Sequence, residues 1–239
     1  MQGQGEGGTV LWLAMTGARC VGRTLATQYA RRVFESRLSQ EQPGWTFVFL
    51  KSPFANLPLP LLEGKQRPKY ARERTLGHWT IFYGFIIEQC LPILERAKRG
   101  ENIVALSDGA GHDIAIDATA YALSDEGRKK ALDLHHDLVH HLLVKEQLPK
   151  PFYYNITASR QTIIRWMLQK FPKLAHMQRE ELERFLSHQI TGTEEYFRTE
   201  ITGQNKFDLD ADCLSMPELA NQLYDHAIDL VSGRIQLAA

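Results

Sequence analysis

The stretch Thr9–Thr24, with the sequence TVLWLAMTGARCVGRT, decides the fold of this chain. Its first half is a nearly unbroken apolar run, which predicts a buried strand over 9–16. Gly17–Thr24 follows at once and fits the pattern G-x-x-x-x-G-K-[ST] except at Arg23, where the pattern has lysine. A helical pattern begins directly after the loop, and its apolar face is expected to carry Leu25, Tyr29, Val33 and Phe34.

A strand, a glycine-framed loop and a helix start together predict a binding site for phosphate. The backbone N–H groups of such a loop and the positive end of the helix dipole attract anions. We therefore expect a nucleotide, ATP in the first place, to be bound by Gly17, Gly22, Arg23 and Thr24, with Thr24 placed to reach Mg²⁺. Arginine keeps the positive charge at position 23, but its planar fork does not replace a lysine ammonium conservatively. The alternative is a strand-to-helix turn that needs its glycines and binds nothing.

Length and composition indicate one globular domain. The chain has 239 residues, and its 28 Lys and Arg balance 28 Asp and Glu, so no overall charge favours nucleic acid or an anionic membrane. No apolar run reaches the roughly 20 residues of a membrane span. Cys20, Cys90 and Cys213 lie far apart, which argues against a disulfide framework and fits a reducing compartment, the cytoplasm or the mitochondrial matrix. Residues 1–8 are expected to be a flexible leader before a single domain over 9–239.

Predicted strands and helices alternate along the chain. The strands are expected at 9–16, 45–50, 102–107, 151–157 and 206–209. Beyond the helix that follows the loop, helices are expected at 72–99, about 126–145, 160–171, 179–202 and 216–231. This alternation predicts a P-loop three-layer α/β sandwich: a five-stranded parallel sheet with helices on both faces, and a small helical lid at about 170–180.

Several segments, in order, resemble the thymidylate kinase family of P-loop nucleoside monophosphate kinases. Gly17–Thr24 resembles the ATP-phosphate loop of that family, and Cys90–Val104 resembles the helix, glycine and strand that lead to its Asp-Arg motif. Ala120-Tyr121, Pro151–Ile156 and Glu180–Tyr196 resemble later segments of the same family. The resemblance implies the fold of thymidylate and deoxynucleoside kinases, with ATP and Mg²⁺ as ligands.

The resemblance also implies roles for individual residues. Arg23 and Asp108 would be the catalytic residues, and Thr24 and Asp108 would hold Mg²⁺. The contacts to the acceptor would come from Phe54, Phe82 and Tyr121. Asp108 follows the third predicted strand, at the edge of the sheet where ligands gather in open α/β proteins. Its alternative role is to cap the turn 109–111.

The chain departs from the family at positions that carry the chemistry. Besides Arg23, Leu106 stands at the spacing of the family's Asp-Arg pair, and Asp108 follows without an arginine beside it. Ile86 stands where the family has an arginine that grips the acceptor phosphate, and Lys51–Phe54 lacks the acceptor-binding arginine. One arginine contact is worth about 10³-fold or more in the rate of phosphoryl transfer. We therefore expect kinase activity to be weak or lost.

Two functions follow from the resemblance. We favour a structural or accessory subunit of a larger assembly that has lost efficient kinase activity and still binds a nucleotide. P-loop kinase relatives serve as accessory subunits of mitochondrial complexes, including the respiratory NADH dehydrogenase, which supports this function by analogy. The alternative is an active nucleoside monophosphate kinase that transfers the γ-phosphoryl group of ATP to a deoxynucleotide. The expected partners are other protein subunits or a second copy of the chain, and not nucleic acid.

The remaining polar candidates have simpler interpretations. We interpret His112 and Asp113 as solvated loop residues and Asp117 as a helix cap. His136 and His140 have the spacing of a zinc site on a helix, but the H-E-x-x-H motif is absent, so histidines on a helix surface are favoured. The arginines that flank the expected lid are interpreted as surface charges; they are Arg160, Arg165 and Arg179.

Overall fold

The computed structural model describes residues 7–17, 21–51, 76–109, 133, 137, 149–170, 172, 179, 180, 183, 187 and 205–234. Most of the predicted leader and of the expected lid lies outside these residues. The helices predicted at about 126–145 and at 179–202 have only isolated residues within the described part. These predictions, and the division of the chain into leader and domain, stay predictions.

The described residues are built on a five-stranded parallel sheet. Its strands are β1 (Val10–Gly17), β2 (Trp45–Leu50), β3 (Asn102–Asp108), β4 (Phe152–Thr157) and β5 (Lys206–Asp210). Their order is β2-β3-β1-β4-β5, and every neighbouring pair runs parallel. The predicted parallel sheet is confirmed, and β1, which leads into the loop, is its central strand.

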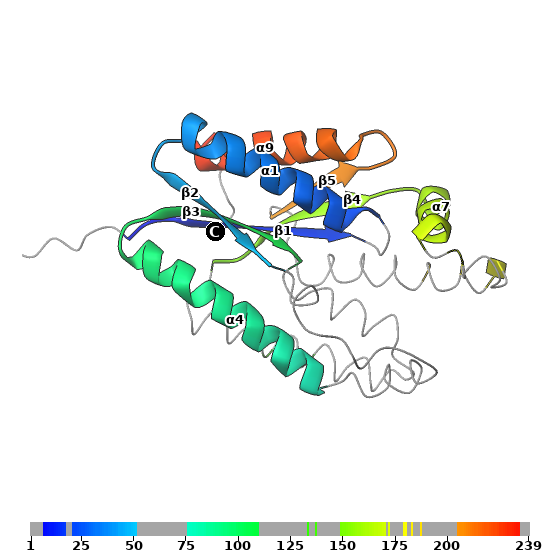
Figure 1. The fold of residues 1–239 in the computed structure, drawn as a ribbon, viewed down its shortest axis with the longest axis horizontal. Helices are drawn as coiled ribbons and strands as arrows, with labels where there is room; N and C mark the ends of the chain where they lie inside the picture. Colours follow the sequence, from blue (N-terminus) through cyan, green and yellow to red (C-terminus); the bar gives the residue numbers. More distant parts are fainter. Residues whose placement is uncertain are drawn as a thin grey trace, which may run out of the picture.

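Helices cover both faces of this sheet, as predicted (Figure 1). The helices α1 (Arg23–Glu41) and α9 (Met216–Val231) lie side by side on one face, and α4 (Leu76–Lys98) lies on the other. The helix α7 (Arg160–Lys170) follows β4. Two helix ends have sequence causes: Ser215 and Glu218 form a capping box before α9, and Gly100, with a φ of +90°, ends the turn after α4.

The larger apolar core lies between the sheet and the α1–α9 pair. Leu13 of β1, Phe34 of α1 and Tyr224 of α9 are all fully or almost fully buried there. The ring of Phe34 stacks on Phe47 of β2 with 5.1 Å between centroids, and it meets the ring of Tyr224 edge-on at 4.9 Å. Because β1 alternates its side chains between the two faces, its odd-numbered residues supply this core.

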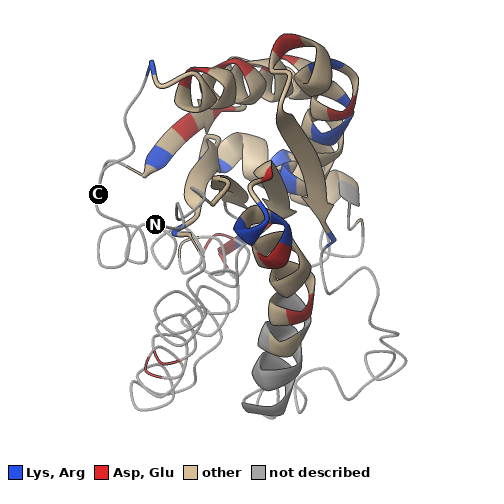
Figure 2. Cartoon of the chain, turned by 90° about the vertical axis from the view of Figure 1, so that its left-hand side faces the viewer, with Lys and Arg blue, Asp and Glu red and all other residues tan. Residues whose placement is uncertain are grey.

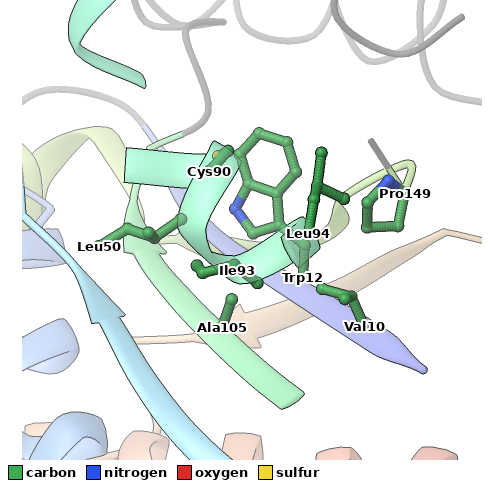
Figure 3. A pocket seen from close by; sticks show the side chains of 8 residues that line it. All are labelled: Val10, Trp12, Leu50, Cys90, Ile93, Leu94, Ala105 and Pro149. Carbon is green, nitrogen blue, oxygen red and sulfur yellow. The ribbon is translucent and has the colours of Figure 1, made fainter. Parts of the chain in front are cut away.

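A smaller apolar cluster lies between the sheet and α4. Trp12 and Ala14 of β1 point to this face, where Cys90 and Ile93 of α4 pack on the sheet. A cavity of ≈ 10 Å³ remains between them (Figure 3), lined by Val10, Trp12, Leu50, Cys90, Ile93, Leu94, Ala105 and Pro149. Small-molecule sites occupy roughly 300 Å³ or more, whereas this space is at the lower limit for one water molecule. The cavity is therefore a packing defect and not an acceptor site.

The apolar face predicted for α1 is wrong at its first position. Leu25 is 49% exposed, and the residues of α1 that turn fully inward are Ala26, Thr27, Ala30, Phe34 and Leu38. The spacing of Ala26, Ala30 and Phe34 sets one stripe along the helix, and Leu25 lies outside it. The two alanines at the start of this stripe are fully buried between α1 and the sheet.

Charged residues lie mainly on the helices and on the edge strand β5 (Figure 2). The strands β1, β2 and β4 have no charged residue, which is typical of a parallel sheet that helices cover on both faces. Within the described ranges, no helix combines the length and the apolar composition needed to cross a bilayer.

Candidate functional site

The two glycines of the loop motif have backbone conformations and contacts that a side chain would disturb. Gly17 ends β1 with a φ of +138°, and a Cβ there would lie 2.5 Å from the carbonyl oxygen of Ile156. Gly22 precedes α1 with a φ of +87°, and a Cβ there would lie 2.7 Å from the Cε atom of Met216. The backbone of β4 therefore requires glycine at position 17, and the left-handed backbone favours glycine at position 22, where the flexible end of the Met216 side chain can move aside. Loop residues 18–20 lie outside the described part.

Arg23 and Asp108 form an ion pair at the start of α1. The Nε–H group of Arg23, the first residue of α1, donates a hydrogen bond to Oδ1 of Asp108, the last residue of β3, at 2.6 Å. The Arg23 side chain is 25% exposed and that of Asp108 is 8% exposed. The cation at the motif's lysine position is thus held on the carboxylate at the end of the neighbouring strand.

Thr24 bonds to the same carboxylate. Its Oγ1 donates a hydrogen bond to Oδ2 of Asp108 at 3.1 Å, so the two oxygens of Asp108 face different partners. Mg²⁺ takes oxygen ligands, and P-loop proteins hold it between a Ser or Thr of the loop and an Asp. The donor set of Thr24 and Asp108 therefore fits Mg²⁺, with Arg23 as the competing cation at the carboxylate.

The N-terminal end of α1 favours an anion. Its first turn holds no acidic residue, it begins with Arg23, and Gly22 offers no side chain that could cap it. The first N–H groups of a helix have no partners within the helix, and the helix dipole adds partial positive charge at this end. This end of the helix can attract a phosphate group, although the Asp108 carboxylate beside it offsets the charge of Arg23.

Three buried polar residues stand at the carboxyl ends of the central strands. They are Thr16 of β1, Ser107 of β3 and Asn155 of β4. The Oγ of Ser107 accepts a hydrogen bond from Nε1 of Trp12 at 2.9 Å, and Nδ2 of Asn155 donates one to Oδ1 of Asp208 at 2.7 Å. The Thr16 hydroxyl is fully buried and has no hydrogen-bond partner among the residues that the structure describes. Sequence reasoning missed these residues, although a change from apolar to polar at the end of each strand marks them.

The structure does not describe the side chains of the other predicted site residues. The residues outside the described part are Phe54, His112, Asp113, Asp117, Tyr121, His136 and His140. Phe82 and Ile86 belong to α4, where their side chains are not described. The turn 109–111, which Asp108 was expected to cap in its alternative role, also lies mostly outside the described part.

The arginines near the expected lid are exposed where the structure describes them. Arg160 and Arg165 lie on the surface of α7. Arg179 is 88% exposed and pairs with Glu183 at 2.9 Å between Nε and Oε1. These positions agree with the interpretation of the three arginines as surface charges.

Cysteine chemistry and a metal cluster gain no support from the described residues. Cys90 and Cys213 are free thiols, and burial raises the pKa of Cys90 to about 12, which keeps it protonated and unreactive. No group of three or more His, Cys, Asp or Glu side chains placed to hold a metal ion occurs in the ranges described.

Solved structures with the same fold are known, although no family model and no curated protein matches this sequence. A deoxyadenosine kinase from M. mycoides with bound dATP is 15% identical, with a TM-score of 0.52 over 91% of this chain and 100% of that chain. The structure of that kinase with bound dCTP is 12% identical, with a TM-score of 0.52 over 92% of this chain and 100% of the other. A thymidylate kinase from Candida albicans is 17% identical, with a TM-score of 0.51 over 98% of this chain and 96% of the other.

These similarities confirm the predicted fold class. The chain has the P-loop α/β fold of deoxynucleoside and thymidylate kinases, and the similarity extends over nearly its whole length. Identities between 12% and 17% establish the fold alone. What the site does has to be argued from its own residues.

Proposed function

We propose that this chain is a nucleotide-binding P-loop protein with weak or no kinase activity that serves as an accessory subunit of a larger assembly. The observation that carries the proposal of weak or no kinase activity is the hydrogen bond of 2.6 Å between Arg23 and Asp108. In P-loop kinases the cation at this position binds the phosphates, and the carboxylate at the strand end serves Mg²⁺. Here each group is engaged by the other.

Phosphoryl transfer depends on positive groups placed around the charge that develops on the migrating phosphoryl. With Arg23 held on Asp108, the N-terminal end of α1 remains to bind a phosphate, and the side-chain cation that would add to the stabilisation of its transfer is engaged elsewhere. A second cation is missing because Ile86 stands where thymidylate kinases have an arginine that binds the acceptor phosphate. Binding without efficient turnover is the function that these residues support best.

The accessory role is supported more indirectly. The apolar core, the parallel sheet and the loop glycines are all intact, while the residues altered relative to kinases carry chemistry. Such a chain can still fold and pack against other subunits. P-loop kinase relatives in mitochondrial complexes give a precedent by analogy.

One observation favours the alternative function, an active kinase. The hydroxyl of Thr24 lies 3.1 Å from the Asp108 carboxylate, and this pair of oxygen ligands suits Mg²⁺. If a nucleotide draws Arg23 to its phosphates, Asp108 is released for the metal. The acceptors named by the fold relatives, deoxyadenosine and thymidylate, are then the substrates to try.

A turnover assay separates the two functions. The full chain is mixed with ATP, Mg²⁺ and either dTMP or deoxyadenosine, and ADP and the phosphorylated product are measured by chromatography. We expect either no product above the blank or a rate far below that of working kinases. Turnover within the usual range of kinases, about 1–100 s⁻¹, would establish the alternative function instead.

A thermal-shift titration tests nucleotide binding on its own. A ligand that binds only the native state raises the melting temperature, and the rise grows with its concentration. We expect ATP to raise the melting temperature of the wild type, and the rise to shrink in Arg23→Met, because the Asp108 carboxylate then has no Arg23 to offset its repulsion of the phosphate. Arg31→Met is the matched control, because it removes an arginine of the same helix that pairs with the exposed Glu35.

Gel filtration of a native extract, followed with an antibody, tests the accessory role. A subunit of an assembly elutes well ahead of one isolated chain. Elution only at the size of one or two chains would contradict the accessory role, and it would leave the proposal of nucleotide binding unaffected.

A further inference from the structure

We infer that Arg23 and Asp108 form a latch, which holds the cation of the phosphate loop away from phosphate until a bound polyphosphate and Mg²⁺ together open it. This inference rests on the proposed nucleotide binding and adds how that binding is controlled. It concerns the residues of this chain, which carries arginine in place of the motif's lysine.

The latch is held by two rigid elements. Arg23 begins α1, and Asp108 ends β3, whose register with β1 is fixed from Val10 opposite Ile103 to Met15 opposite Asp108. The bond between Nε and Oδ1 measures 2.6 Å and links residues 85 positions apart. Neither partner reaches the other through a flexible loop, so the pair is a feature of the folded sheet and helix.

The unequal exposure of the two side chains favours opening by an anion. The guanidinium is 25% exposed, so a ligand can reach it, while the carboxylate is 8% exposed. A carboxylate that is nearly buried costs free energy when it loses the cation paired with it. A phosphate that draws Arg23 away therefore binds more weakly than it would to a loop whose cation is not held by a carboxylate.

Mg²⁺ removes this cost. Once Arg23 leaves Oδ1, the carboxylate has an open oxygen beside the Thr24 hydroxyl, which already bonds to Oδ2 at 3.1 Å. A divalent cation there replaces the lost positive charge. Conversely, Mg²⁺ alone has to displace Arg23, which then needs an anion. Each ligand thus lowers the cost of binding the other, which is a positive coupling between two sites.

The test measures how the removal of Asp108 acts with and without Arg23. ATP affinity is measured by calorimetry in EDTA for the full-length wild type, Asp108→Asn, Arg23→Gln and the double variant. A latch predicts that Asp108→Asn raises the affinity about tenfold when Arg23 is present. In the Arg23→Gln background the same change should raise it no more than about threefold, because only repulsion between carboxylate and phosphate is removed. Glu35→Gln, which removes one negative charge from an exposed pair on α1, should leave the affinity unchanged.

The outcomes are distinct. The latch is supported if Asp108→Asn raises the ATP affinity more when Arg23 is present than when it is replaced by glutamine. Equal gains in both backgrounds overturn it and leave nucleotide binding in place. Absence of ATP binding in all four proteins overturns the proposed nucleotide binding, and the latch with it.

A second measurement applies even if Arg23→Gln binds ATP too weakly to measure. The NMR signal of the Arg23 Nε–H group, assigned by its loss in Arg23→Lys, should exchange slowly with water in the wild type. It should exchange rapidly in Asp108→Asn, and its shift on addition of ATP should be larger with Mg²⁺ than in EDTA. Equally rapid exchange in the wild type and in Asp108→Asn would overturn the latch.

Discussion

The α1–α9 face of the sheet and the carboxyl-terminal edge of β1 and β3 are held together by different interactions, although α1 contributes to both. On the face, Phe34 of α1 and Tyr224 of α9 are fully buried in the larger apolar cluster. At the edge, Arg23 and Thr24 of the same helix meet Asp108 through polar contacts. The first region depends on shape and apolar area, and the second on charge.

The difference teaches why a fold of this kind persists when its chemistry changes. Packing on the face requires Phe34, and the glycine turns require Gly17 and Gly22, but nothing in the packing of the described residues requires a lysine at position 23. Arginine is accepted there because the end of β3 supplies a carboxylate to pair with it. Stability and ligand binding should therefore respond to different substitutions.

The largest effect on stability is expected from Phe34→Ala. The ring is 1% exposed and contacts Phe47 and Tyr224, so truncation leaves a cavity between α1, β2 and α9. Deleting a buried ring of this kind lowers the free energy of unfolding by about 3–5 kcal/mol, which urea denaturation measures.

Leu25→Ala is the control for this substitution. Leu25 lies on the same helix but is 49% exposed, so the change should stay within about 0.5 kcal/mol. A loss from Leu25→Ala comparable to that from Phe34→Ala would mean that the face does not end where the structure places it.

Gly17→Ala should have the next largest effect, because it acts where the two regions meet. Forcing an alanine into a φ of +138° costs about 1–3 kcal/mol, and the Cβ would also lie 2.5 Å from the Ile156 carbonyl oxygen. Gly44→Ala is the matched control, since Gly44 has a φ of +103° and a Cβ there would have no atom of the described residues within 4 Å. Thermal unfolding should show a clearly larger loss for Gly17→Ala. Equal losses would mean that backbone strain alone, and not the close approach of β4, explains the glycine.

The fold was predictable from the sequence to a larger extent than the site. The strand at 45–50 and the helix at 216–231 have the predicted bounds, because apolar runs and helical periodicity are local signals. The order of the strands was not predicted, since it depends on contacts between distant segments. For the same reason Asp108 was predicted as a site residue, but its bond to Arg23 was not. Leu25 was placed wrongly because a short apolar pattern does not fix the rotation of a helix.

On the α1–α9 face, the titration of His226 should make the free energy of unfolding depend on pH. This residue of α9 is partly buried, stacks on Phe207 at 4.3 Å and has its Nδ1 2.9 Å from the Oη of Tyr154. Burial lowers the pKa of His226 below 6.5, and the nearby Asp229 opposes this only in part. Between the lowered pKa and 6.5 the unfolded chain binds more protons, so the free energy of unfolding falls as the pH drops below 6.5.

His226→Gln tests this expectation, because glutamine does not titrate in that range. The loss of unfolding free energy between pH 7 and pH 5, measured in urea, should be smaller in the variant than in the wild type. An unchanged loss would mean that His226 has the same pKa in the folded and the unfolded chain. Its burial on the α1–α9 face would then not affect the pH dependence of stability.

The smallest effect on stability and the most specific effect on binding are expected from Thr24→Val. Thr24 is exposed, so loss of its bond to Asp108 should change the free energy of unfolding by no more than about 0.5 kcal/mol. The same hydroxyl is the proposed partner of Mg²⁺, and the loss of a metal partner of this kind weakens metal binding by about tenfold or more. The gain in ATP affinity that Mg²⁺ provides, measured by calorimetry with and without EDTA, should therefore shrink in Thr24→Val.

This gain should persist in the control variant Thr27→Val, because the Thr27 hydroxyl bonds to the Arg23 carbonyl oxygen on the buried side of α1. If Mg²⁺ strengthens ATP binding equally in both variants, the metal does not use the edge of β3, and charge at that edge serves only to hold α1 in place.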